Sequence, residues 1–314
     1  MSTRKIDLES SRAAINSIFN QRIELGIDEA NRSRISIRKL GDLELYREGD
    51  YCDERVLYRE LRKAIFESNT VTWGLKGYLL DMQLRELLAR HSYSLSLNDS
   101  IYRDIGYIEG ISLNLKELSD VVKVDGVLLG LDKLGHFFAE GWHYYEMLAF
   151  ADKTVYDALA WGREKEAGLF GYTTTGIFSY ADLTANFNGM RFWNRVLLKH
   201  DDPLKGVIGN LLERPYVSCD IQIVESFKAG ELVKAWESNA AFDIAEYIDG
   251  SWDEGNNCNS YADPIIEAKV SKRARDADPG FTCPYRKEAC SSSRAKYGEF
   301  SRFLLHPSCL SVEQ

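Results

Sequence analysis

The sequence predicts a mostly α-helical protein, namely a helical bundle followed by an irregular, cysteine-bearing C-terminal region. Three observations lead to this fold class. Apolar residues recur at helical spacing in the first 200 residues, no proline precedes Pro203, and five of the six cysteines follow residue 200. Because proline breaks the interior of a helix, the proline-free part can form long helices, whereas the remainder is interrupted repeatedly.

The composition and length suggest three consecutive regions. We expect an N-terminal helical region over 1–125, a central helical bundle with a polar site over 126–200, and a C-terminal region over 201–314 that disulfides could staple. A chain of 314 residues is also long enough for one large domain or for two ordinary domains of about 150 residues each.

In the N-terminal region, we expect helices where apolar residues line one face of the helix. Three segments have this pattern, namely Ser10–Leu25, Asp53–Glu67 and Leu75–His91. Glycine and polar residues interrupt Ser92–Leu115, and Lys116–Val122 reads as a short helix or a connector.

Three further helices are expected in the central region, over Gly130–Ala151, Thr154–Ala167 and Tyr180–His200. Ser179 is a candidate N-cap for the last of them, with Asp182 as its partner in an arrangement like a capping box. Beyond residue 200 we expect a helix over Asp220–Asn239 and a short one over Ala241–Ile248.

Charge and hydropathy exclude two classes of protein. The chain has 39 basic and 48 acidic residues, a formal charge of −9, and no basic stripe interleaved with aromatic residues, so nucleic acid is not an expected partner. No apolar run approaches the roughly 20 residues of a transmembrane helix. We therefore expect a soluble chain without a transmembrane segment.

The cysteines and the N-terminus point to different compartments. Cys258, Cys283, Cys290 and Cys309 lie in polar sequence without C-x-x-C spacing, so disulfides are favoured over zinc, with three possible connectivities. Disulfides predict a periplasmic or otherwise exported protein. The N-terminus lacks the apolar segment of a signal peptide, which instead favours the cytoplasm and free, buried thiols.

Candidate site residues gather on two expected helices. Asp132, His136, Glu140 and His143 stand at offsets 0, 4, 8 and 11, which places them on one helical face at about 100° per residue. Asp182, Asn186, Gly189 and Trp193 repeat this spacing. If the two faces meet, they form a polar cluster inside the bundle.

Three interpretations of this cluster remain open. In an acid–base site, Asp132 or Asp182 orients His136 as general base, and Lys133 stabilises developing negative charge. In a metal site, His136, Glu140 and His143 bind a divalent cation together with a carboxylate from the other helix. The Glu-x-x-His form of di-iron bundles occurs once here, although such sites need two copies. A purely structural hydrogen-bond network is the third interpretation.

Two motifs add a family resemblance. Asp132-Lys133-Leu-Gly-His136-Phe resembles the Asp-Lys-x-x-His-Phe signature of the VanZ-like superfamily and of related bacterial envelope lipoproteins of unknown function. The segment from Ser179 through Asp182 and Asn186 to Gly189 resembles their second signature, and Lys165-Glu166 stands where these proteins carry an acidic residue. The resemblance covers 131–189 and implies an envelope-associated helical bundle whose polar centre comprises Asp132, Lys133, His136, Glu166, Asp182 and Asn186.

Two functions follow as hypotheses. The first is a hydrolase of an envelope lipid or glycan intermediate, with His136 as general base and Asp182 as its partner or as a metal ligand. The second is a non-enzymatic binding or scaffold protein of the envelope, in which the polar cluster is structural. The expected partner is an envelope component or a small-molecule or lipid substrate.

Overall fold

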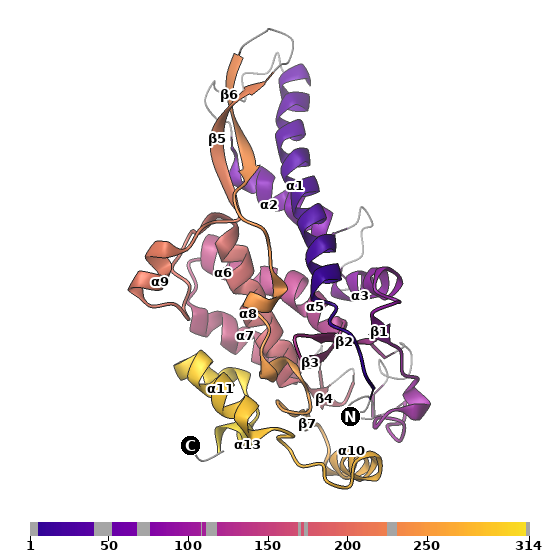
Figure 1. Ribbon diagram of the computed structural model, residues 1–314. Helices are drawn as coiled ribbons and strands as arrows, with labels where there is room; N and C mark the ends of the chain where they lie inside the picture. Colours follow the sequence, from indigo (N-terminus) through magenta and orange to yellow (C-terminus); the bar gives the residue numbers. More distant parts are fainter. Residues whose placement is uncertain are drawn as a thin grey trace. The chain divides into compact units, whose positions relative to one another are not determined.

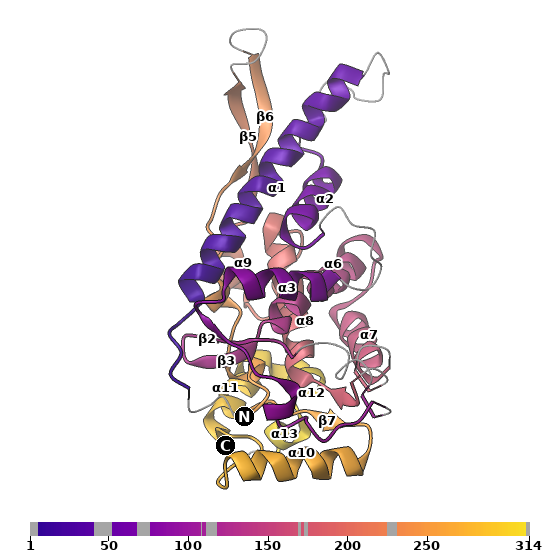
Figure 2. The same ribbon diagram turned by 90° about the vertical axis from the view of Figure 1, so that its right-hand side faces the viewer.

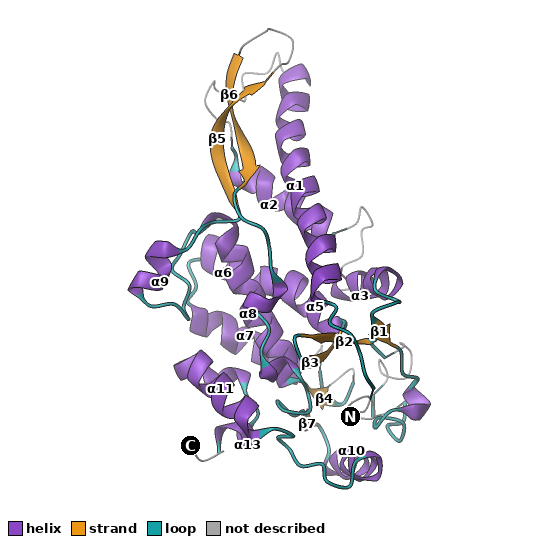
Figure 3. Cartoon of the chain, in the orientation of Figure 1, coloured by secondary structure: helices purple, strands orange, loops and turns teal. Residues whose placement is uncertain are grey.

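The computed structural model describes residues 6–40, 52–67, 76–107, 109–110, 118–168, 171–172, 175–224 and 231–311. Helices predominate among them and the strands are few, so the mostly helical class is confirmed (Figures 1 and 3). The chain divides into two compact units, each assembled from distant segments. The first unit comprises 1–13, 77–193 and 244–314, and the second comprises 14–76 and 194–243.

The second unit contains most of α1 (Arg12–Leu40) and all of α2 (Glu54–Ile65). Both helices were expected, although α1 continues beyond the expected end at Leu25. The side chain of Asp53 caps α2 by accepting hydrogen bonds from the backbone N–H groups of Arg55 and Val56. Gly26 allows the two helices to approach closely, because a Cβ there would lie 2.8 Å from Leu61 Cα.

The expected helix over Asp220–Asn239 is wrong. The chain instead forms an antiparallel hairpin of β5 (Val217–Val224) and β6 (Glu231–Ser238). From Val217 to Ile223, valine, cysteine and isoleucine alternate with serine, aspartate and glutamine. That period of two is typical of a strand, and the β-branched residues strengthen it.

Two asparagines of α1 hold the second unit together. The Asn31 amide accepts from the backbone N–H of Trp236 and donates to its carbonyl, both at 3.0 Å. Asn20 makes the same pair of bonds with Phe242, at 2.8 and 2.9 Å. Each amide thus satisfies both the N–H and the C=O of one residue. The four hydrogen bonds fix the position of α1 along the segment that contains Trp236 and Phe242.

The helix α3 (Lys76–Leu87), which belongs to the first unit from Gly77 onward, precedes an antiparallel sheet of β1 (Ser92–Tyr93), β2 (Val121–Val124) and β3 (Val127–Gly130). The helix over Leu75–His91 is therefore confirmed in a shorter form. Of the segment read as a short helix or connector, residues 121–122 belong to β2, and Lys116 lies outside the described residues.

The three central helices are confirmed. They are α5 (Asp132–Gly135) continuing through a π-helical turn (His136–Glu140) into α6 (Gly141–Phe150), then α7 (Val155–Ala167) and α8 (Tyr180–Leu197). Ser179 caps α8 as expected, because its Oγ accepts from the backbone N–H of Asp182 at 3.2 Å. The acidic partner of the cap differs, since the N–H of Ser179 donates to Glu166 Oε1 at 3.0 Å.

Glycines bring α6 and α8 into close contact within the first unit. A Cβ on Gly141 would lie 2.6 Å from Gly189 Cα, so neither position accommodates a larger residue. Around this crossing pack aromatic side chains that are almost fully buried, namely Phe137, Phe138, Trp142, Phe192, Trp193 and Trp252. Trp193 also donates to the carbonyl of Phe138 at 2.8 Å. The polar residues of these helices are thereby held against a rigid aromatic core.

The C-terminal region is more regular than the sequence indicates. It contains α10 (Pro264–Ala277), α11 (Lys287–Tyr297), α12 (Ser301–Leu304) and α13 (Pro307–Leu310). Strand β7 (Ser260–Tyr261), beside α10 in Figure 2, pairs with β4 (Ile177–Phe178). Pro264 and Pro307 start helices, because the first helical position needs no N–H. The expected helix over Ala241–Ile248 is reduced to one 3-10 turn, Ile244–Glu246.

The predicted disulfides are confirmed. Cys258 pairs with Cys283 and Cys290 pairs with Cys309, which selects one of the three connectivities. A third disulfide, within the second unit, joins Cys52 to Cys219. All six cysteines are therefore paired. In the described part of the chain, no helix is both long enough and apolar enough to cross a membrane.

We predict that thiol titration of the denatured protein without reductant finds no free thiol, and that reduction releases six. Replacing Cys290 and Cys309 together by serine should lower the free energy of unfolding by about 3 kcal/mol, because the unfolded chain regains the entropy of a loop of this length. Chemical denaturation measures the loss. Six titratable thiols before reduction would contradict the pairing.

Candidate functional site

Lys133 stands at the centre of an ionic cluster in the first unit. Its ammonium lies 2.9 Å from Asp132 Oδ2, 2.7 Å from Asp182 Oδ1 and 2.6 Å from Glu254 Oε1. The Lys133 side chain is only 3% exposed. Burial lowers the pKa of this ammonium, but the three carboxylates outweigh burial and raise it well above its usual value. Lys133 therefore stays charged and is no nucleophile.

Asp182 joins this cluster to His136. One carboxylate oxygen contacts Lys133, and the other, Oδ2, lies 3.2 Å from His136 Nε2. Burial lowers the pKa of His136, whereas the charges of Asp182 and Glu166 raise it, and the net shift is upward. A carboxylate against one ring nitrogen fixes the tautomer and the orientation of an imidazole.

The other nitrogen of His136 faces Asn186, which lies one turn after Asp182 on α8. Nδ1 of His136 is 3.1 Å from the Asn186 side-chain amide. The amide nitrogen is better placed toward the ring, where it can donate to His136 Nδ1 at 3.1 Å and to the Asp182 carbonyl at 3.1 Å. A neutral His136 then carries its proton on Nε2, toward Asp182. Both ring nitrogens are engaged, and the side chain is still 22% exposed.

Glu166, on α7, is the buried acid of the site. Desolvation and the nearby Asp182 charge raise its pKa to about 8, so the carboxyl is largely protonated at neutral pH. Its Oε1 accepts from the N–H of Ser179 at 3.0 Å, which ties α7 to the start of α8. A carboxyl whose pKa lies near neutral pH can serve as a general acid or base.

Glu254 is the site residue that the sequence analysis missed. It follows the 3-10 turn Gly250–Trp252 of the C-terminal region, where no periodic pattern marks it. Its other oxygen, Oε2, accepts from Tyr102 Oη and from Asn259 Nδ2, both at 3.1 Å. Burial raises the pKa of Glu254, but the charge and hydrogen bond of Lys133 and the hydrogen bond of Asn259 together outweigh burial, and the net shift is downward.

Asp132 is positioned by a chain of hydrogen bonds from α3. The N–H of Asp132 donates to Ser119 Oγ at 2.7 Å, and Ser119 Oγ donates to Asp81 Oδ1 at 2.9 Å. Arg85 forms an ion pair with Asp81, with 2.9 Å between Nη2 of the arginine and Oδ2 of the aspartate. Burial, and then the charge of Asp132, raise the pKa of Asp81. Asp132 itself is 39% exposed, so the cluster reaches solvent at this side chain.

The structure separates the residues of the expected metal set. The π-helical turn of five residues, His136–Glu140, adds a residue to the turn, which shifts the phase of all later positions. His143 is 45% exposed and its Nδ1 lies 3.6 Å from Glu146. In the described ranges, His136, Glu140 and His143 form no group with ligand atoms within 4.8 Å of one another.

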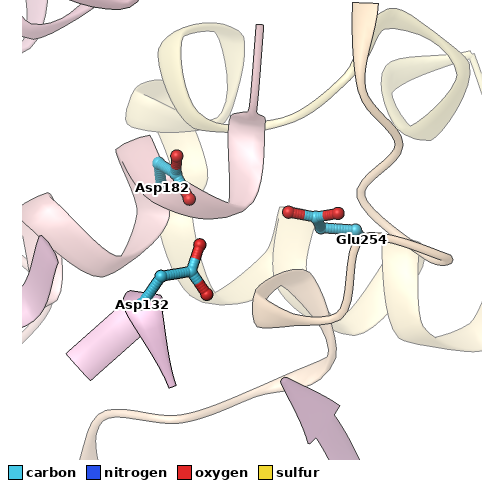
Figure 4. Close-up of side chains that lie close together, drawn as sticks. All are labelled: Asp132, Asp182 and Glu254. Atoms are coloured by element: carbon cyan, nitrogen blue, oxygen red, sulfur yellow. The ribbon is translucent and has the colours of Figure 1, made fainter. Parts of the chain in front are cut away.

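A different acidic trio does converge. Oxygen atoms of Asp132, Asp182 and Glu254 lie within 4.8 Å of one another, a spacing compatible with a cation (Figure 4). The ammonium of Lys133 lies within 2.9 Å of all three. Lys133 thus supplies the positive charge that these carboxylates require, and the trio gives no separate argument for a metal ion.

No protein-family model, curated protein or solved structure matches this chain. Its function must therefore be inferred from the cluster itself. The structure brings together the six residues Asp132, Lys133, His136, Glu166, Asp182 and Asn186, and it adds Glu254.

We predict that Glu166→Gln flattens the dependence of stability on pH. The pKa of Glu166 is raised on folding, so its contribution is fully present below about pH 4.5 and is lost as pH rises through about 8. The free energy of unfolding of the wild type should fall by more than about 1 kcal/mol between pH 5 and pH 8, and that of the variant should fall by less. Thermal unfolding at each pH measures this. Glu164→Gln, at an exposed position of α7, is the control and should behave as wild type.

Lys133→Met should lower the free energy of unfolding by about 3 kcal/mol, because it leaves the carboxylate of Asp182, which is only 12% exposed, without its counter-ion. Urea denaturation measures the change. Lys153→Met, at an exposed position before α7, is the matched control and should change stability by less than about 0.5 kcal/mol. Equal midpoints for the two variants would contradict the central role of Lys133.

Proposed function

We propose that this chain is an exported, envelope-associated protein whose cluster is the acid–base centre of a hydrolase. The observation that carries the proposal is the pair formed by His136 and Asp182, at 3.2 Å, beside a carboxyl at Glu166 whose pKa is about 8. Perturbed titratable groups concentrate at functional sites. The three disulfides support export, because disulfides persist in oxidising compartments.

His136 is the proposed proton acceptor. Asp182 holds the proton of the neutral ring on Nε2, which leaves the lone pair on Nδ1. A water molecule must take the place of the Asn186 amide at Nδ1 before His136 can activate it. The 22% exposure of His136 gives solvent access to the ring. Glu166, protonated at neutral pH, is the candidate acid for the leaving group.

The net charge of the cluster limits the class of substrate that it can bind. Three carboxylates face one ammonium and one imidazole, so the cluster carries excess negative charge even when His136 is protonated. Lys133 is already paired and has little capacity to stabilise an anion, in contrast to the role that the sequence suggests. A neutral or amine-bearing glycan therefore fits better than an anionic lipid phosphate, which these carboxylates would repel.

The alternative is a binding or scaffold protein in which the cluster is structural. The specific observation in its favour is that Lys133 is 3% exposed and paired three times. Such a network ties together the segments that supply its charged side chains. The two functions predict different effects of removing His136.

His136→Ala should abolish hydrolysis of glycan fragments from bacterial envelopes, while its melting temperature falls by only a few degrees, because the ring is partly exposed. The same assay on His143→Ala, an exposed histidine of α6, should give wild-type activity and stability. The measurements are product release by chromatography and thermal unfolding. Unchanged activity of His136→Ala, or a loss of activity explained by unfolding, would favour the structural role.

A further inference from the structure

The short helix α9 (Val207–Leu212), in the second unit, turns its apolar side toward solvent. Val207 is 87% exposed, Ile208 74%, Leu211 82% and Leu212 73%. At about 100° per residue these four lie within an arc of about 140°. Surface helices normally direct such a face to the core. We call these four residues the α9 tip.

The opposite side of α9 is anchored by polar contacts. Asn210 accepts from the N–H of Asp202 at 2.8 Å and donates to the carbonyl of Lys205 at 2.9 Å. Glu213, at the end of the helix, pairs with Lys205 and with Arg195, the latter at 2.7 Å. Its side chain is 2% exposed. These polar contacts fix the orientation of α9, so that its apolar side faces solvent.

The size and shape of the α9 tip distinguish between possible occupants. A stable protein interface needs roughly 20–30 residues on each side, and the tip offers four on a helix of six residues. Insertion into a bilayer needs no complementary surface, and its strength scales with the apolar area that is buried. All four residues are at least 73% exposed, so the α9 tip projects from the surface and does not line a groove.

We propose that the α9 tip inserts into the surface of a lipid bilayer and attaches the protein reversibly to it. The four side chains are aliphatic and carry no group that needs a hydrogen bond. The chain has a formal charge of −9, so anionic lipids repel it and zwitterionic lipids are the preferred surface. Binding is driven by apolar burial and is largely insensitive to salt.

Sedimentation with vesicles tests this proposal on the full, oxidised chain. The wild type should sediment with phosphatidylcholine vesicles, and less with vesicles containing phosphatidylglycerol. The double variant Ile208→Ser and Leu211→Ser should lose at least tenfold in partitioning, since each buried CH₂ group contributes about fourfold. Neither residue belongs to the ionic cluster or to the anchor of α9.

Ile265→Ser is the matched control, because Ile265 is 60% exposed on α10 and lies outside the α9 tip. It should bind vesicles as wild type does. Wild-type protein that stays in the supernatant, or equal sedimentation of wild type and double variant, would overturn the proposal. So would a dimer in sedimentation velocity that the double variant dissolves, because the tip would then contact a second copy.

Discussion

The buried ammonium of Lys133 is the constraint on which the first unit depends. A charge with 3% exposure is stable only if opposite charges surround it. Those charges come from α5, from α8 and from the segment after Trp252. Because all three carboxylates must lie beside the charged Lys133, the ion pairs fix the relative positions of three segments that are far apart in the sequence.

The resulting cluster explains how the neighbouring groups acquire their properties. Asp182 is oriented by Lys133 and in turn orients His136, while its charge helps to keep Glu166 protonated. The close approach at Gly141 and Gly189 brings the helices carrying these groups together. Removing Lys133 would thus change the electrostatics of every other group in the site.

The sequence was sufficient to predict the site where helical periodicity holds. Asp182 and Asn186 do share a face of α8, and both meet His136. The same arithmetic does not hold after His136, because the π-helical turn His136–Glu140 changes the number of residues per turn. Glu254 was missed since it lies in a non-periodic segment, and only the fold places it beside Lys133.

The C-terminal region contributes a residue to the site. Glu254 lies four residues before Cys258, whose disulfide to Cys283 constrains the same segment. The carboxylate of Asp253 also accepts from the N–H of Gly255 at 2.8 Å, which fixes the backbone around Glu254. Reducing the disulfide loosens the segment that presents one of the three counter-ions of Lys133. Oxidising conditions, in which disulfides persist, therefore also favour the position of Glu254 beside Lys133.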